Sequence, residues 1–191
     1  MFCVFKFAPQ ISHYFGDFYI SLNSFKAVSQ GRYKTSSSKV TFYSKAPLED
    51  IEGKNSESQG IIDAGAKTFF FKIPVKSFDL KSDLMEEHFN ENYMESEKYP
   101  YATYKGTIET PVNFKKDGEY TLTSKGELNI HGVVQKREIV ALISIKKNVT
   151  TITSSFKVKL ADHKIEIPSL VFQKIAEEVE VSLEAILNEM K

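Results

Sequence analysis

The stretch GELNIHGVVQKREIVALISI, residues 126–145, holds two runs of β-branched and aliphatic residues on either side of a His-Gly pair. Strand-forming runs that flank a two-residue turn are typical of a β-hairpin. Gly132 accepts the positive φ that such a tight turn requires. The pattern therefore predicts an antiparallel hairpin with His131 at its bend.

His131 has two interpretations. Alternation along the strand puts it with Glu127 and Asn129, while Leu128 and Ile130 point the other way. A catalytic histidine needs a nucleophile or an orienting carboxylate within reach. The sequence offers it no Gly-x-Ser-x-Gly elbow and no cysteine nucleophile. We expect a turn and hydrogen-bonding role, with proton transfer as the less favoured alternative.

Further strands follow from composition and alternation. In TFFFKIPVKSF (68–78), Phe69, Phe71 and Ile73 share one face, and a period of two is typical of a half-buried strand. Pro74 cannot donate to a strand ladder, so it marks an edge or a bulge. The segment 48–67 is interpreted as turns around a small apolar element. Strands are also predicted at 38–47, 99–110, 114–130, 151–160 and 179–187, although the last also fits a helix.

The period changes in residues 79–96, where Leu80, Leu84, Phe89 and Tyr93 recur at helical spacing. Asp83 followed by Glu86 resembles a capping box, in which the first residue accepts free N–H groups of the helix. We predict a short helix over about 83–91 that covers one end of a sheet as a lid.

About eight short strands with regular turn signals and one short helix predict an all-β protein, either an antiparallel sandwich or an up-and-down barrel. A barrel of about eight strands has room for one small or slender ligand. The chain of 191 residues is long enough for one domain, and 41% of its residues are hydrophobic.

Composition narrows the function further. The 25 basic residues equal the 25 acidic ones, so charge gives no reason to expect a nucleic-acid partner. No run of 18 apolar residues occurs, which excludes a typical transmembrane helix. The one cysteine, Cys3, excludes an intrachain disulfide and disfavours a cysteine-based zinc site.

Residues 1–29 are apolar and aromatic but broken by polar residues, and we interpret them as an atypical export signal or an N-terminal extension. The motif AVSQ places Ala27 and Ser29 where signal peptidase requires small residues. Cleavage there would leave Gln30 first in the mature chain. Residues 30–191 are then expected to form the barrel domain.

Three stretches together resemble the YceI-like, polyisoprenoid-binding family. They are DLMEEHFNENYMESEKYPYATYKG (83–106), the hairpin at 126–145 and, more weakly, TFFFKIPVKSFD (68–79). The resemblance covers residues 38–187. It implies a lipocalin-like antiparallel barrel that encloses a long apolar chain such as a polyprenyl lipid. It also implies a periplasmic or secreted bacterial protein.

On this resemblance we expect non-enzymatic binding and carriage of a long-chain apolar lipid, of polyisoprenoid or fatty-acyl type, without a cofactor. Large apolar residues of the predicted strands and helix are expected to contact the lipid: Phe69, Phe71, Ile73, Phe78, Leu84, Phe89, Tyr99, Tyr104, Ile108, Leu128 and Ile130. The oligomeric state stays open, a homodimer included.

Two alternatives remain. One is a hydrolase or isomerase that uses His131 or His88; the other is an envelope stress or structural protein whose barrel is filled by its own side chains. Glu87, His88, Glu91 and Glu95 form the best metal-like cluster, but His-x-x-Glu falls short of the ligands that a metal site needs. We expect a solvated helix face there, with no metal.

Overall fold

The computed structural model describes residues 31–168 and 175–190. Cys3, the expected export signal and the expected mature terminus at Gln30 lie outside the described residues. The strands are β1 (Arg32–Lys45), β2 (Asp50–Asn55), β3 (Gln59–Asp63), β4 (Thr68–Pro74), β5 (Tyr101–Ile108), β6 (Gly118–Ile130), β7 (Val133–Lys146), β8 (Val149–Lys159) and β9 (Glu178–Glu189). The helices are α1 (Asp83–His88) and short 3-10 or π turns at η1 (Val75–Ser77), η2 (Phe89–Tyr93) and η3 (Leu160–His163).

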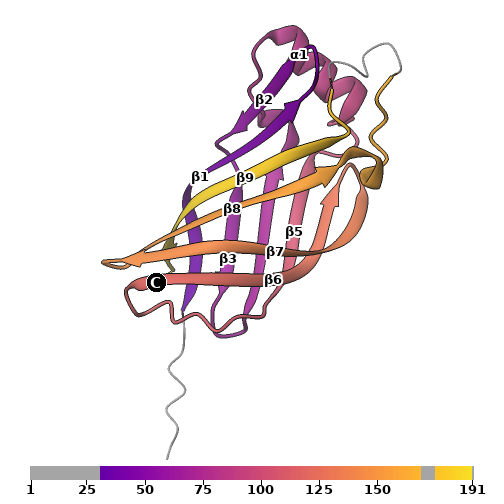
Figure 1. Ribbon diagram of the computed structural model, residues 1–191. Helices are drawn as coiled ribbons and strands as arrows, with labels where there is room; N and C mark the ends of the chain where they lie inside the picture. The colour runs from indigo at the N-terminus through magenta and orange to yellow at the C-terminus, as the bar shows by residue number, and fades with distance from the viewer. Residues whose placement is uncertain (1–30, 169–174, 191) are drawn as a thin grey trace, which may run out of the picture.

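Eight strands form a closed antiparallel barrel (Figure 1). They run in the order β1-β3-β4-β5-β6-β7-β8-β9, and β9 returns to pair with β1. Closure gives partners to strands that would otherwise be sheet edges. The predicted all-β antiparallel barrel with one short helix is therefore confirmed.

The long strand β1 has two partners in succession on one edge. Its first residues pair with β3, and Val40–Lys45 pair with β2. The segment 48–67, interpreted from sequence as turns around a small apolar element, thus forms both β2 and β3. Asn55, the last residue of β2, holds the chain at this break: its side-chain amide donates to the Pro74 carbonyl of β4 at 2.8 Å, and its oxygen accepts from the Glu57 amide.

The hairpin predicted at residues 126–145 joins β6 and β7. Ile130 pairs with Val133, and the two residues between them take positive φ angles of 52° at His131 and 71° at Gly132. This is the type of two-residue turn that follows the twist of antiparallel strands. The predicted hairpin is confirmed, and His131 itself occupies a left-handed position.

The N-cap of the helical segment lies one residue earlier in the chain than predicted. Ser82, not Asp83, is the N-cap: its hydroxyl accepts from the Met85 amide at 3.3 Å. Ser82 is extended whereas Asp83 is already helical, and a cap residue must have non-helical backbone angles. Glu86 reaches back to the Leu80 amide at 3.0 Å. The segment continues through η2, so the helix extends to Tyr93.

The two ends of the barrel are covered differently. At one end the loop between β5 and β6 buries Val112 and Phe114, whose ring lies 5.0 Å from that of Tyr33. At the other end lies α1 (Figure 1), and η2 packs Phe89 against Phe42 and Phe78. Between these covers, the inner faces of the strands form the core.

Strand β9 settles the ambiguous segment at 179–187. It pairs with β8 on one side and β1 on the other. Ala185 and Leu187 are almost fully buried in the barrel, while Ile186 between them faces outward. A helix at 179–187 would leave β1 and β8 each without a hydrogen-bonded neighbour on this side. Closure of the barrel therefore selects the strand.

Candidate ligand cavity

An apolar cavity of about 100 Å³ lies inside the barrel. All eight barrel strands contribute to its lining, because alternate residues of each strand point inward. The lining residues are Val40, Ser58, Ile62, Phe69, Phe71, Ile73, Tyr104, Ile108, Leu122, Ser124, Leu128, Ile139, Ala141, Ile152, Ser154, Phe156, Val181 and Leu183.

The hydroxyl groups of this lining bond to the protein itself. The Tyr104 hydroxyl lies 3.1 Å from the Ser124 hydroxyl, which donates to the Ile139 carbonyl at 2.8 Å. Ser58 donates to the Ser38 hydroxyl at 2.6 Å. Burial raises the pKa of the Tyr104 hydroxyl, so it is neutral at physiological pH. The cavity therefore presents a nearly apolar surface.

The structure brings six of the eleven predicted residues together around this cavity. They come from three neighbouring strands and are Phe69, Phe71, Ile73, Tyr104, Ile108 and Leu128. The rings of Phe69 and Tyr104 are 4.8 Å apart, across the β4–β5 ladder. Contact of these residues with a ligand stays a prediction.

The other five predicted residues lie outside the cavity lining. Phe78 and Phe89 pack with Phe42 beneath the helix, with ring centroids 5.2–5.6 Å apart. Leu84 is 60% exposed, because the apolar side of α1 that faces the barrel carries Met85 instead. Tyr99 and Ile130 are separated from the cavity for a different reason.

Tyr99 and Ile130 both lie in the region of the β6–β7 turn. The Tyr99 ring packs edge-on against His131, with centroids 4.7 Å apart, and a Cβ at Gly132 would stand 2.4 Å from it. Ile130 packs with Leu128 and Val158 near the same turn. These side chains support the hairpin bend rather than the cavity wall.

Sequence reasoning missed the lining residues of β1, β3, β7, β8 and β9, among them Val40, Phe156 and Leu183. Their segments do alternate, which is the signal that marks an inward face. However, β1 and β9 are about 150 positions apart in sequence, and their pairing depends on closure of the barrel. Alternation alone leaves open which strands share an interior.

The matching family model, described as the YceI-like domain, covers residues 32–187. The chain belongs to the YceI-like family. No curated protein matches the sequence at a significant level.

Solved structures share the fold of this YceI-like chain. Burkholderia cenocepacia BcnA is 19% identical, with a TM-score of 0.66 over 78% of this chain and 95% of its own. A polyisoprenoid binding domain from Saccharophagus degradans, implicated in plant cell wall breakdown, is 16% identical, with a TM-score of 0.71 over 83% and 98%. The Campylobacter jejuni YCEI protein is 18% identical, with a TM-score of 0.58 over 73% and 85%.

In this YceI-like chain His131 ties three segments together. Its Nε2 donates to a Glu95 carboxylate oxygen at 2.8 Å, and its Nδ1 lies 3.1 Å from the His163 carbonyl. Both partners are acceptors, so both bonds form together when the ring carries two protons. The hydrogen bond from His131, helped by the charge of Lys98, lowers the pKa of the Glu95 carboxyl. The orienting carboxylate that sequence reasoning did not find is therefore Glu95.

The chemistry around His131 is that of a structural clasp. Both of its ring nitrogens are engaged by a carboxylate and a backbone carbonyl, and within the described residues neither nitrogen bonds a serine, threonine or cysteine. His163 is fully buried, and burial lowers the pKa of its imidazole against the opposing effect of the Val133 and Ile130 carbonyls.

The residues weighed as a metal cluster do not converge. Glu87, His88 and Glu91 are exposed on the helical segment, while Glu95 is bonded to His131. Across residues 31–168 and 175–190, no group of three or more metal-ligating side chains lies close enough together to hold an ion. Nor does any helix in these ranges have the length and apolarity needed to cross a membrane.

Proposed function

We propose that this YceI-like chain binds one long apolar chain, of polyisoprenoid or fatty-acyl type, inside its barrel and carries it without altering it chemically. The observation that carries the proposal is the interior cavity, whose lining from all eight strands is apolar and whose hydroxyls are bonded within the protein. A lining of this kind favours hydrocarbon over any ligand with several polar groups. The related fold of a polyisoprenoid binding domain supports the same ligand class.

Burial of hydrocarbon supplies the affinity. Each methylene removed from water contributes about 0.8 kcal/mol, so a dozen contribute roughly 10 kcal/mol before the cost of ordering a flexible chain is subtracted. No hydrogen bond or charge is needed for binding of this kind. The ligand would be held by the length of its apolar part.

The size of the cavity sets a condition on this proposal. A volume of about 100 Å³ is below the roughly 300 Å³ at which ligand pockets usually begin. Binding of a long chain therefore requires the interior to widen. Phe71, Phe156 and Leu183 are among the lining side chains that are only partly buried, so they can move with less loss of packing than the fully buried ones.

The same small volume favours a second candidate, an envelope protein whose barrel is filled by its own side chains and which acts through its surface. Catalysis has less support. His131 has both nitrogens engaged in the clasp, His88 is exposed on the helical segment, and the Tyr104 hydroxyl has a raised pKa.

Solvent extraction tests the proposal. Protein purified from its native cell without detergent is extracted with chloroform and methanol, and the extract is analysed by mass spectrometry. One apolar lipid per barrel supports carriage. Protein that yields no lipid, and takes up none from polyprenyl alcohol or fatty acid in solution, supports the side-chain-filled barrel instead.

A further inference from the structure

The ladder between β7 and β8 ends before either strand does. These strands pair from Lys146 with Val149 as far as Ala141 with Ser154. On its other edge β7 pairs with β6 along its length, and β8 pairs with β9 as far as Lys159. Residues 133–140 and 155–159 therefore face each other without a backbone ladder. We name this part of the wall the β7–β8 seam; the two strands diverge there in Figure 1.

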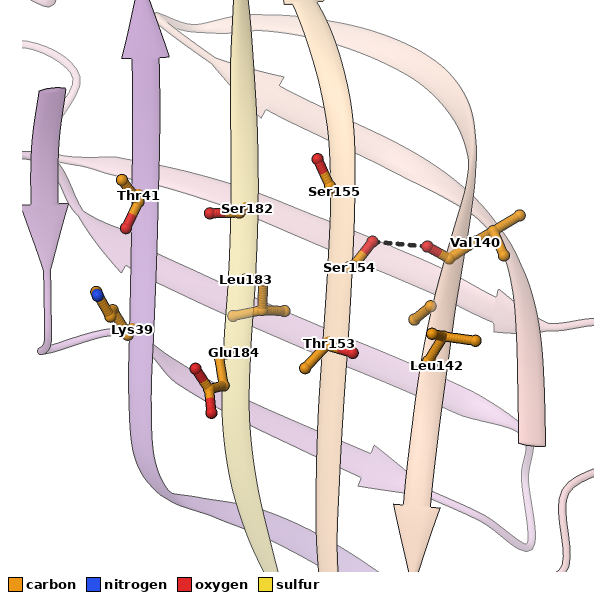
Figure 2. Close-up of a pocket in the computed structure, with 11 residues that line it drawn as sticks. Lys39, Thr41, Val140, Leu142, Thr153, Ser154, Ser155, Ser182, Leu183 and Glu184 are labelled. Atoms are coloured by element: carbon orange, nitrogen blue, oxygen red, sulfur yellow. Dashed lines mark hydrogen bonds between the residues drawn. The ribbon is translucent and has the colours of Figure 1, made fainter. Parts of the chain in front are cut away.

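Side chains close the seam in place of backbone amides. The Ser154 hydroxyl donates to the Val140 carbonyl at 2.7 Å, as the dashed line in Figure 2 shows. Arg137 donates from Nη2 to the Lys157 carbonyl at 2.6 Å. Separating the strands here breaks these side-chain bonds and leaves the β6–β7 and β8–β9 ladders whole. Water can replace them at the surface at little cost.

Burial of the inner face changes at the same point. Where β7 and β8 are paired, the inward side chains Ile143 and Ile152 are 1% and 4% exposed. Beyond the end of the ladder, Phe156 also lines the interior cavity but is only partly buried, as is Leu183 on the adjacent strand. Ile139 and Val158 of the seam are still buried, at 6% and 2% exposed, so the inner wall is less completely covered only around Phe156.

A second hollow, of about 430 Å³, lies on the outer face of the barrel over β1, β9, β8 and β7 (Figure 2). Three of its lining residues, Ala141, Ser154 and Leu183, also line the interior cavity. The outer hollow and the cavity therefore lie on opposite sides of the same stretch of wall, where the β7–β8 ladder ends and the seam begins. Val140 and Leu142 border the outer hollow and are 50% and 61% exposed, which offers an apolar approach to it.

We infer that the β7–β8 seam is the opening through which an apolar chain passes between the outer hollow and the interior cavity. This inference rests on the proposed function. It explains how a ligand reaches the interior although both ends of the barrel are covered, one by Phe114 and the other by the Phe42, Phe78 and Phe89 cluster.

A chemical staple tests the seam. Glu138 and Lys157 are exposed residues on opposite sides of it, and neither lines either hollow. In a Cys3→Ser background, Glu138→Cys with Lys157→Cys is joined by a short bismaleimide. The matched control is Ser144→Cys with Thr151→Cys, a pair that already faces each other within the ladder. Each double-cysteine variant is compared with the same variant before it has reacted with the bismaleimide.

Uptake and release of the fluorescent polyene parinaric acid are followed by stopped flow. The seam staple is expected to slow both rates by about tenfold and to leave the equilibrium affinity unchanged, because it raises one barrier that both directions share. The control staple should change neither rate. Ser154→Ala, which removes one closing bond, should raise both rates.

The outcomes separate the two proposals. Wild-type protein takes up the probe in this case, but neither the seam staple nor Ser154→Ala changes the rate. That result would overturn the seam proposal and leave the lipid-binding proposal intact. Loss of affinity through faster release, with uptake no slower, would mean that the staple disturbs the cavity rather than the passage and would also overturn the seam proposal. Wild-type protein that takes up no probe would overturn lipid binding, and the seam with it.

Discussion

The carboxylate of Glu95 accepts a hydrogen bond of 2.8 Å from His131, a residue 36 positions later in the chain. This bond joins the turn after the helical lid to the bend of the β6–β7 hairpin. Tyr99 packs on the same imidazole, and the His163 carbonyl lies 3.1 Å from its other nitrogen. One histidine thus fastens the lid segment, the hairpin and η3 at the same place.

Replacing His131 should loosen this clasp and leave the cavity unchanged. Asparagine tolerates the positive φ of the turn but is too short to keep both bonds. We expect His131→Asn to lower the free energy of unfolding by about 1 kcal/mol in urea titrations, since Glu95 is partly exposed. Glu95→Gln is the matched control, and the double variant should cost less than the sum. A variant with an unchanged urea midpoint that no longer binds lipid would show that His131 contacts the ligand.

His163 should make stability depend on pH in the weakly acidic range. Its folded-state pKa is lowered by burial, so below the usual histidine pKa of about 6.5 the unfolded chain takes up a proton that the folded chain does not. Stability is therefore complete above that value and falls as the pH decreases toward the lowered folded pKa. We expect His163→Gln, which can still donate to the Val133 carbonyl, to be less stable throughout but with a flatter slope. Urea midpoints at about pH 7.5, 6.5 and 5.5 measure the slope. Equal slopes in both proteins would contradict the prediction.

A bulky residue in the cavity should compete with lipid. Ile73 lines the cavity from β4, and Ile73→Trp adds volume without charge. Lipid uptake should fall sharply, whereas Ile61→Trp on the exposed face of β3 should leave it unchanged. Melting temperatures are compared after delipidation, because bound ligand stabilises the folded state by mass action.

The stability of delipidated Ile73→Trp separates the two candidate functions. In an interior that widens, the added ring should be accommodated with little loss. In a solid core, overpacking should cost about 1–3 kcal/mol. A strongly destabilised variant, made from a wild type that carries no lipid, would end the carrier proposal.

The export interpretation predicts a defined N-terminus. The motif AVSQ ends in Gln30, and cleavage before it removes residues 1–29. N-terminal sequencing of the protein from a periplasmic fraction of its native cell should begin at or near Gln30. Recovery of an intact Met1 from the cytoplasmic fraction would reject export.

Local pattern alone determined much of the fold. The His-Gly pair placed the β6–β7 bend correctly, because a left-handed turn demands residues that tolerate positive φ. Alternation put Phe69, Phe71 and Ile73 on one face, and all three line the cavity. These features depend on neighbours in the chain, which is why the sequence shows them directly.

Features that join distant segments were decided only by the tertiary structure. Pairing of β1 with β9 closes the barrel and brings Val40 and Leu183 to the cavity, while Phe78 and Phe89 are drawn into the cluster under the lid. The partnership of Glu95 with His131 and the seam that begins beyond Ser154 likewise depend on strand register and divergence. Register between distant strands depends on the packing and hydrogen bonding of the whole barrel, which no short stretch of sequence specifies.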